Sequence, residues 1–202
     1  MYNGAMTTAD AEVRAPGRPR DRRVEEGILR ATQDLLITEG YAGMTVADVA
    51  RTAGSGKSAI YRRWPSKVQL VVAAVRALQS EQPLPNTGSL RDDLLACAMH
   101  YARADERASR VLASLLSELG RDRELYEAAH AVIGGPPVAA LVAVIERWQE
   151  RGVIAASRPV GLIAGIVPSV AFGSVSLRQR GLDPDTVTQL VDSVLLPALL
   201  AD

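Results

Sequence analysis

Basic and hydroxyl-bearing side chains gather in the segment KSAIYRRWPSK, which starts at Lys57. Lys and Arg donate hydrogen bonds to phosphate oxygens and to guanine edges, and Ser and Tyr hydroxyls also reach phosphates. At helical spacing one face of this segment carries Ser58, Tyr61 and Arg62, with Lys57 and Ala59 at its flanks. Because the first residues are small, this face can enter a major groove, where Lys57 and Arg62 would meet phosphates or guanine edges.

The same residue types allow a simpler interpretation. Lys57, Arg62 and Arg63 can form an ordinary solvated face, and Tyr61 can be a half-buried tyrosine without a ligand. Trp64 is most simply a core residue that locks its helix to the next one. From the residue types alone both interpretations stay open, so the flanking elements decide between them.

Capping residues mark the elements that would hold this face in place. Thr45 is followed three residues later by Asp48, which is a capping-box arrangement, and the apolar pattern after it predicts a short helix. Gly54 ends that helix, and Ser55 is expected to cap a second short helix that ends near Trp64. The very short turn between the two forces them to cross steeply, which is helix-turn-helix geometry.

Helical patterns continue along the rest of the chain. Apolar residues recur at helical spacing from Val24, and Gly40 provides a stop for this first helix. No run of residues alternates for long enough to predict a strand, so we expect an all-α protein of about nine helices. The later helices are expected at about 66–79, 89–104, 106–119, 122–133, 138–151, 158–179 and 183–200.

The charge of the chain is unevenly distributed, although its formal net charge is zero. Residues 14–67 hold 11 Lys and Arg against 6 Asp and Glu, whereas residues 68–202 hold 12 against 15. This asymmetry is typical of a small polyanion-binding module that is joined to a domain with another task.

Cysteine usage and apolar segments limit where the protein works. The single cysteine, Cys97, excludes an intrachain disulfide and is expected to be a core residue in a reducing compartment. Residues 1–20 lack the apolar segment of a signal peptide. Residues 159–177 carry no charge and would just span a bilayer, but their prolines, glycines and serines favour a buried helix. We therefore expect a cytoplasmic protein without a membrane partner.

The segment TVADVARTAGSGKSAIYRRWPSKVQL, from Thr45 to Leu70, resembles the DNA-binding signature of TetR-type transcriptional regulators. The capping Thr, the Ala-Gly turn, the Tyr and the Pro-x-Lys ending fall in register, and the match covers about residues 21–70. The resemblance implies that Thr45, Tyr61 and Lys67 contact DNA phosphates. It also implies contacts to the bases or their backbone from Lys57, Ser58, Ala59 and Arg62.

The resemblance implies three parts of the chain and one function. Residues 1–20 would be a flexible basic arm, residues 21–66 a three-helix DNA-binding domain, and residues 67–202 a helical domain for effector binding and dimerisation. The protein would be a sequence-specific regulator, most simply a repressor that a small-molecule effector releases from a palindromic operator in double-stranded DNA. The alternative is a ligand-independent or nucleoid-type DNA-binding protein, which would bind any duplex with similar affinity.

The basic arm allows two further hypotheses. Arg18 and Arg20 flank Pro19, and we expect this segment to be extended. An extended Arg-Pro-Arg segment is narrow enough to lie in an A·T-rich minor groove beside the major-groove helix. Equally, the arm can be a disordered basic tail that adds only salt-sensitive affinity.

Small residues recur at every fourth position of the uncharged segment and predict a close helix contact. They form a ridge that lets another helix approach, and an apolar ridge that includes Leu162 lies beside it. The last helix adds further apolar residues, so two helices of each chain can pair with their copies in a homodimer. The alternative is that both are ordinary internal helices. The residues expected at the dimer interface are Gly161, Gly165, Ser169, Gly173, Leu190 and Val194.

The family resemblance also implies an effector pocket in the second domain. The apolar bias of that region predicts a small, largely apolar effector. Two histidines without a cysteine cluster make a poor metal site, and we expect neither a metal nor a cofactor. The segment GSGKS at 54–58 lacks the spacing of a phosphate-binding loop, and we predict no catalytic residues. The side chains nominated for the pocket are Met99, His100, Tyr126, His130, Trp148 and Phe172.

Overall fold

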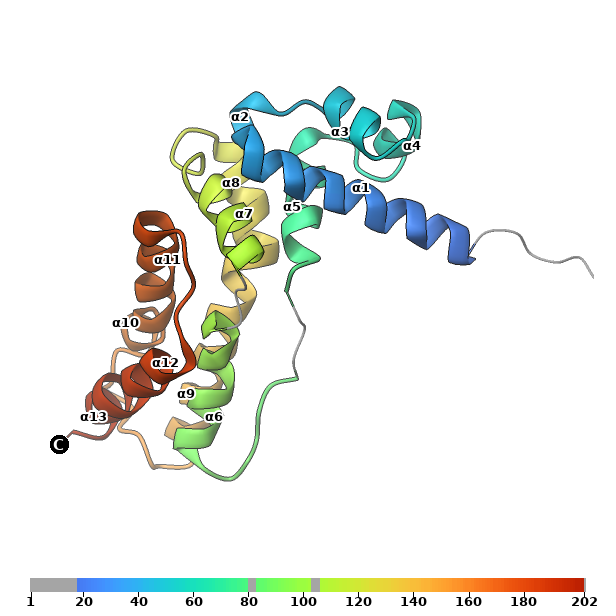
Figure 1. Ribbon diagram of the computed structural model, residues 1–202. Coiled ribbons are helices and arrows are strands. Elements are labelled where there is room, and N and C mark those ends of the chain that lie inside the picture. Colours follow the sequence, from blue (N-terminus) through green and yellow to red (C-terminus); the bar gives the residue numbers. More distant parts are fainter. Residues whose placement is uncertain (1–17, 80–82, 103–105, 202) are drawn as a thin grey trace, which may run out of the picture.

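The computed structural model describes residues 18–79, 83–102 and 106–201, with side chains from Asp21 onward. Within these ranges every regular element is helical, which confirms the expected all-α fold (Figure 1). The α-helices are α1 (Arg18–Thr38), α2 (Gly40–Gly43), α3 (Val46–Thr52), α4 (Lys57–Tyr61), α5 (Lys67–Arg76), α6 (Leu90–Ala98), α7 (Glu106–Leu116), α8 (Arg123–Ala129), α9 (Gly135–Glu150), α10 (Val160–Ala164), α11 (Ile166–Arg178), α12 (Pro184–Leu190) and α13 (Leu196–Leu200). A 3₁₀ turn, η1 (Met99–Ala102), follows α6, and π turns join α8 to α9 (η2, His130–Gly134) and α12 to α13 (η3, Val191–Leu195).

Two hydrophobic cores organise the helices. The N-terminal core joins α1, α3, α4 and α5 to α7, α8 and η2, and it includes Ile28, Ile60 and Leu115. The C-terminal core joins α6 to α9 through α13, and it includes Leu94, Leu141 and Leu195. Figure 1 shows α1 to α5 together at one end of the molecule, with α6, α12 and α13 at the other. The N-terminal core therefore contains helices from both sides of residue 66, where the boundary between two domains is expected.

The start of α3 follows the predicted capping box, whereas the start of α4 differs from the prediction. Thr45 and Asp48 form the reciprocal capping box, and Ser66 and Ser89 each accept a hydrogen bond from the first turn of their helix. The prediction for Ser55 is wrong, because α4 begins one residue later with Gly56 as its N-cap. The backbone N–H of Ser55 instead donates to the carbonyl of Ala50 at 2.9 Å, which keeps Ser55 in the turn.

π turns accommodate prolines inside two helical stretches, one of which lies where separate helices are expected at 122–133 and 138–151. The chain stays helical from α8 into α9, and Pro136 and Pro137 occupy the first turn of α9 directly after η2. A proline has no N–H and clashes with the carbonyl four residues before it, so the wider turn relieves the conflict. Pro197 follows η3 in the same way.

Gly135 occupies a position where a side chain does not fit. A Cβ atom there would lie 2.8 Å from the carbonyl oxygen of His130. We expect Gly135→Ala to lower the free energy of unfolding by about 1–3 kcal/mol, the usual cost of overpacking. The matched control is Gly27→Ala in α1, where nothing lies within 4 Å of the new Cβ; it should raise stability by about 0.5–1 kcal/mol. Urea unfolding measures both, and equal effects would contradict the packing described for Gly135.

Two helical stretches are long and apolar enough to cross a membrane by length and composition alone. They span Arg123–Glu150 and Val160–Arg178, and 28% and 39% of their most apolar windows are buried. Core helices of soluble proteins pass the same test, so this finding is weak evidence for a membrane span. One helix is expected over residues 158–179. The structure instead has two helices there, because Gly165 separates α10 from α11.

Candidate nucleic-acid interface and ligand cavity

The capping box of α3 fixes the first helix of the candidate DNA-binding motif. The hydroxyl of Thr45 donates to Asp48 Oδ2 at 2.5 Å, and the Asp48 N–H donates to Thr45 Oγ1 at 3.2 Å. The hydrogen bond from the Thr45 hydroxyl, followed by the charge of Arg51 and the hydrogen bond from the Thr45 backbone N–H, holds the pKa of Asp48 below its usual value. Thr45 is exposed at the helix start, but its hydroxyl proton is already used by Asp48. A phosphate contact from this hydroxyl therefore requires an exchange of partners.

Helix α4 presents the face that the sequence predicted. Ile60 is fully buried and anchors the inner side of the helix in the N-terminal core, together with Trp64 just after it. The outer side carries side chains that can meet DNA: Lys57, Ser58, Tyr61 and Arg62 are exposed, and Ala59 is half-buried. The structure thus brings all five predicted residues of this segment to one surface.

Arg63 has a different place from its neighbour Arg62. Its side chain is mostly buried, donates to the carbonyl of Ala59 at 3.1 Å, and forms an ion pair with Asp21 in the first turns of α1. Arg63 therefore ties the end of α4 to α1 instead of belonging to a solvated face. No sequence signal predicts this role, because adjacent arginines differ only in their helical phase.

Lys67 is the first residue of α5 and lies at the edge of the same surface. Its Nζ is 4.3 Å from the centre of the Tyr41 ring, and Tyr41 belongs to α2. The side chain is partly buried, which lowers the pKa of Lys67, while Asp122 and Glu118 act in the opposite direction. The cationic group thus lies over the aromatic ring of Tyr41, within the electrostatic influence of Asp122 and Glu118.

The expectation of an extended Arg-Pro-Arg segment is wrong for the backbone of Arg18 and Arg20. Both residues lie in the first turn of α1, together with Pro19. Proline is well tolerated in a first helical turn, because its missing N–H would have no partner there and its φ suits the helix. The remainder of the predicted arm, residues 1–17, lies outside the described residues.

A cavity of about 110 Å³ lies between the two hydrophobic cores and is called the inner cavity here. An adjoining groove of about 730 Å³, the outer groove, shares Gln79 and His100 with it. The inner cavity is lined by Val75, Leu78, Gln79, His100, Tyr101, Ala108, Leu112, Ile133, Ala171, Phe172 and Val175. The outer groove is lined by Arg76, Gln79, Pro83, Leu84, Pro85, Ala96, Cys97, His100, Ala131, Val132, Pro136, Pro137 and Ala140.

Two of the six side chains nominated for the pocket line these spaces, namely His100 and Phe172. Tyr126 and His130 instead stack on each other at the exposed surface of the helix, with ring centroids 5.8 Å apart. Met99 packs against the C-terminal core, and Trp148 is buried there with its N–H bonded to Asp93. Residue size on a helix does not tell a cavity wall from ordinary core packing, which explains why these four side chains lie outside the two spaces.

Tyr101 is a cavity residue that the sequence did not single out. It is 8% exposed, and its ring lies edge-on to Phe172 at 6.4 Å between centroids. Its hydroxyl is buried without a hydrogen-bond partner, and burial raises the pKa of Tyr101 above its usual value. Burial likewise raises the pKa of Cys97 to about 11, so this thiol stays protonated as the expected core residue.

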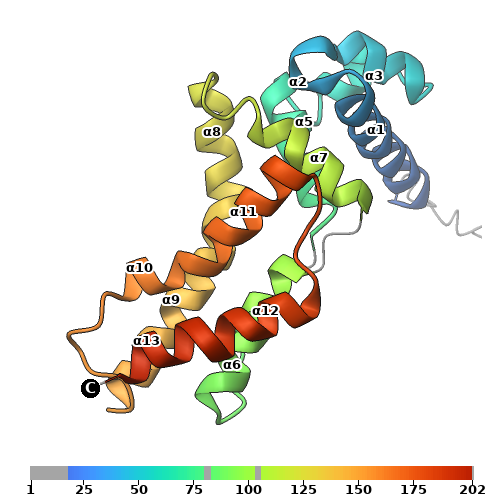
Figure 2. The ribbon, with the colours of Figure 1, turned by 60° about the vertical axis from the view of Figure 1, so that its left-hand side comes forward.

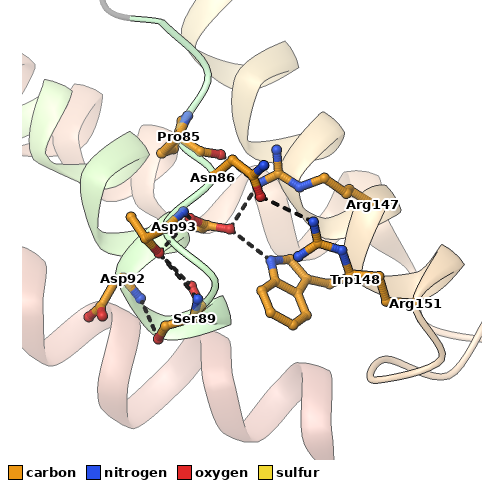
Figure 3. Close-up of polar contacts among 9 residues, drawn as sticks. Pro85, Asn86, Ser89, Asp92, Asp93, Arg147, Trp148 and Arg151 are labelled. Atoms are coloured by element: carbon orange, nitrogen blue, oxygen red, sulfur yellow. Dashed lines mark hydrogen bonds and ion pairs between the residues drawn. The ribbon is translucent and has the colours of Figure 1, made fainter.

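The buried carboxylate of Asp93 lies at the centre of a network of hydrogen bonds (Figure 3). Asp93 is fully buried and accepts hydrogen bonds from the N–H and hydroxyl of Thr87, at 2.7 and 2.8 Å. Its other oxygen accepts from Arg147 at 2.8 Å and from the indole N–H of Trp148 at 3.0 Å. Arg147 also donates to the carbonyl of Pro85, so the segment before α6 is clamped onto the end of α9.

The predicted dimer residues lie on α10, α11, α12 and η3, and exposed apolar side chains lie on these helices and on α13. Figure 2 shows α10, α11, α12 and α13 on the same side of the molecule. Leu162 and Leu177 are 72% and 86% exposed there, and Val170 and Leu200 are exposed as well. Of the predicted set, Gly161, Ser169 and Val194 are exposed, and Gly165, Gly173 and Leu190 are partly exposed. Large exposed leucines on a helix face are typical of an unfilled protein interface.

Within the described ranges no group of three or more His, Cys, Asp or Glu side chains is placed to hold a metal ion. Carboxylates also pair with arginines, as Asp34 does with Arg107 and Asp192 with Arg91. These ion pairs join α1 to α7 and α6 to η3, so they connect helices that are distant in sequence.

Two known sequence families match different parts of the chain. Residues 28–74 match the sequence family described as "Bacterial regulatory proteins, tetR family". Residues 84–194 match the family described as "Tetracyclin repressor-like, C-terminal domain". The second match alone spans more than half of the chain.

Individual proteins extend these matches over most of the length. An uncharacterized HTH-type transcriptional regulator of Mycobacterium tuberculosis is 31% identical over 186 residues, which cover 92% of this chain and 90% of that protein. The DNA-binding transcriptional repressor TetR of Mycobacteroides abscessus is 28% identical over 172 residues, covering 84% and 90%. The structure of FadR from Bacillus subtilis in complex with stearoyl-CoA has a TM-score of 0.63 at 15% identity, covering 86% and 97%. At that identity the likeness to FadR shows the fold alone.

Proposed function

Because the chain belongs to the TetR family of bacterial regulatory proteins and is a DNA-binding transcriptional regulator, we propose that it is a homodimeric repressor of the cytoplasm. The family assignment confirms the resemblance of residues 45–70. In this proposal α4 reads a palindromic operator, and a small molecule in the inner cavity releases the protein. The observation that carries the proposal is the exposed face of α4 on a helix whose inner side is fixed by buried Ile60.

The contacts to DNA follow from the geometry of the motif. Lys57, Ser58, Ala59 and Arg62 are proposed to meet base edges and the adjoining backbone, because they share the outer face of α4. Tyr61 is 48% exposed and can donate its hydroxyl to a phosphate. Thr45 and Lys67 lie at the starts of α3 and α5, where helix N-termini also favour a phosphate. Arg18 and Arg20 remain candidates for backbone contacts from the start of α1.

The apolar surface on α10 and α11 supports the homodimer. Two copies that pair through Leu162, Val170 and Leu177 would bury side chains that water otherwise surrounds. A two-fold dimer presents two copies of α4, which matches two inverted half-sites about one helical turn, roughly 34–36 Å, apart. Site selection from random duplex DNA checks this arrangement, since a monomeric reader would enrich a single half-site.

The position of the inner cavity suggests how an effector would act. Val75 of α5 and Leu112 of α7 belong to the N-terminal core, whereas Ala171 belongs to the C-terminal core, and all three line the cavity. A ligand that separates these walls would therefore shift α5, which follows the DNA-reading helix directly. An engineered cavity of about 150 Å³ holds benzene, so the inner cavity suits a slimmer group such as the end of an alkyl chain.

The chemical class of the effector follows from the shape of the two spaces. A narrow apolar end that opens into a wider groove fits an elongated molecule, with its slim end beside Phe172 and its bulk in the outer groove. FadR of Bacillus subtilis binds stearoyl-CoA, an elongated molecule of this kind, on the same fold. We therefore propose a largely apolar, chain-bearing effector.

A cavity-filling variant tests the effector site. Leu112→Phe is expected to occupy part of the inner cavity without separating its walls, and therefore to leave operator affinity within about threefold of the parent. Straight-chain fatty acids and alkyl phenols, added to the protein–DNA complex, should release the parent but not the variant. Fluorescence anisotropy of labelled operator measures the release. Equal release of parent and variant by the same compound would place its binding site elsewhere.

A further inference from the structure

Three side chains from distant parts of the chain meet beside the start of α5. The Nζ of Lys67 lies 4.3 Å from the centre of the Tyr41 ring, and the Tyr41 hydroxyl donates to Asp122 Oδ2 at 3.1 Å. The second oxygen of Asp122 accepts the N–H of Leu125 at 2.9 Å and caps α8. We call Lys67, Tyr41 and Asp122 the polar bridge. It connects the helix-turn-helix to the first turn of a helix from the second half of the chain.

The capping role of Asp122 does not account for the whole bridge. One carboxylate oxygen is sufficient to cap α8, and the other is committed to Tyr41. The Tyr41 side chain is partly buried, and burial followed by the hydrogen bond with Asp122 raises the pKa of Tyr41 to about 12. Tyr41 thus stays neutral. Its ring lies beneath the ammonium group of Lys67, and its hydroxyl donates a hydrogen bond to the carboxylate of Asp122.

The charges around Lys67 oppose a contact with DNA. Asp122 and Glu118 both favour the charged form of Lys67 electrostatically, so their carboxylates attract the ammonium group. A DNA phosphate must draw the same group away from them. The strength with which Lys67 holds a phosphate therefore depends on residues that never touch DNA.

We propose that Asp122 and Tyr41 are positioning residues that restrain Lys67 and so limit the affinity for DNA. This inference rests on the proposed contact between Lys67 and a phosphate. The bridge also joins Lys67 to α8, whose continuation η2 contributes Ile133 to the inner cavity. A displacement of α8 would thus reach a DNA-contacting cation through Asp122 and Tyr41 as well as through the packing of α5.

A double-mutant cycle on the full-length protein tests the inference. Asparagine caps helices about as well as aspartate does, so Asp122→Asn removes the negative charge and keeps a capping side chain at the start of α8. At low salt it should tighten binding to the selected operator about two- to fivefold, in line with the small energy of one partly exposed charge–charge attraction. The matched control is Glu127→Gln on the same helix, where Glu127 pairs with Arg123 instead; it should change affinity by less than about twofold.

The cycle is completed in a Lys67→Ala background, where the effect of Asp122→Asn should vanish. Lys67→Ala alone should weaken binding and reduce the slope of log affinity against log salt by about 0.9. Equal effects of Asp122→Asn and Glu127→Gln, or an effect of Asp122→Asn that persists without Lys67, would overturn the proposed restraint. An unchanged salt slope in Lys67→Ala would show that the phosphate contact itself is wrong, and the inference would fall with it. Melting temperatures close to the parent confirm that each variant is folded.

Discussion

Replacing Asp93 with alanine is expected to lower the free energy of unfolding by about 3–5 kcal/mol, the usual result of removing one partner of a buried ion pair. Asp93 has no exposed surface, and it accepts hydrogen bonds from Thr87, Arg147 and Trp148. Alanine would leave the guanidinium of Arg147 and the indole N–H of Trp148 without their acceptor in the protein interior. Chemical unfolding followed by circular dichroism measures the change.

The neighbouring carboxylate provides the control for this prediction. Asp92 is exposed, and its closest charged partner is Arg91 at 3.5 Å, so Asp92→Asn should change stability by less than about 0.5 kcal/mol. Similar effects at Asp93 and Asp92 would contradict the clamp between the segment before α6 and the end of α9.

The same carboxylate predicts a direction for the dependence of stability on pH. Burial raises the pKa of Asp93, but hydrogen bonds from Thr87 and Trp148 and the charge of Arg147 outweigh it and lower the pKa below 3.8. A carboxyl with a lowered pKa in the folded state stabilises the protein above its unfolded pKa. The contribution of Asp93 should therefore be complete above about pH 4 and decline as the pH falls further.

The largest loss of DNA affinity is expected when Lys57 and Arg62 are both replaced with alanine. Both side chains are exposed on the outer face of α4, so their removal should leave the fold intact. A base contact of this kind contributes about 1–3 kcal/mol, so the double variant should bind the selected operator weaker by on the order of 10²-fold or more. Binding to scrambled DNA should weaken less, because only the charge contribution is lost there.

A charge-matched pair of substitutions separates base reading from net charge. Arg110→Ala combined with Arg180→Ala removes the same charge from exposed positions outside the helix-turn-helix. This pair should change operator affinity by less than about threefold at moderate salt, because distant charges are screened. If both double variants lose affinity equally on operator and scrambled DNA, α4 does not read sequence. Anisotropy titrations at one salt concentration supply all four affinities.

Local signals in the sequence were sufficient for the DNA-binding motif. A capping box depends on two residues three positions apart, and the outer face of α4 depends only on helical spacing, so Thr45, Asp48 and the α4 residues were placed correctly. Ser55 was misplaced because the Ala-Gly turn uses its backbone N–H, and a serine next to a glycine offers two possible starts for the same helix.

Long-range contacts explain what the sequence did not predict. The partners of Asp93 lie 6, 54 and 55 residues away, and no local pattern distinguishes this aspartate from exposed Asp92 beside it. The cavity wall at Tyr101 likewise depends on how α7 and α11 meet, which helical spacing does not specify. Trp148 is nominated for the pocket because of its size, but its indole N–H donates a hydrogen bond to buried Asp93, away from the two spaces.

The most direct test of the central claim is the ratio of two affinities, measured at one fixed salt concentration. One duplex carries the site selected from random DNA by the full-length protein, and the other carries the same bases in scrambled order. A dimeric regulator should enrich an inverted repeat and bind it tighter by on the order of 10³-fold or more. A ratio near one would contradict sequence-specific regulation and would identify the protein as a nucleoid-type DNA-binding factor.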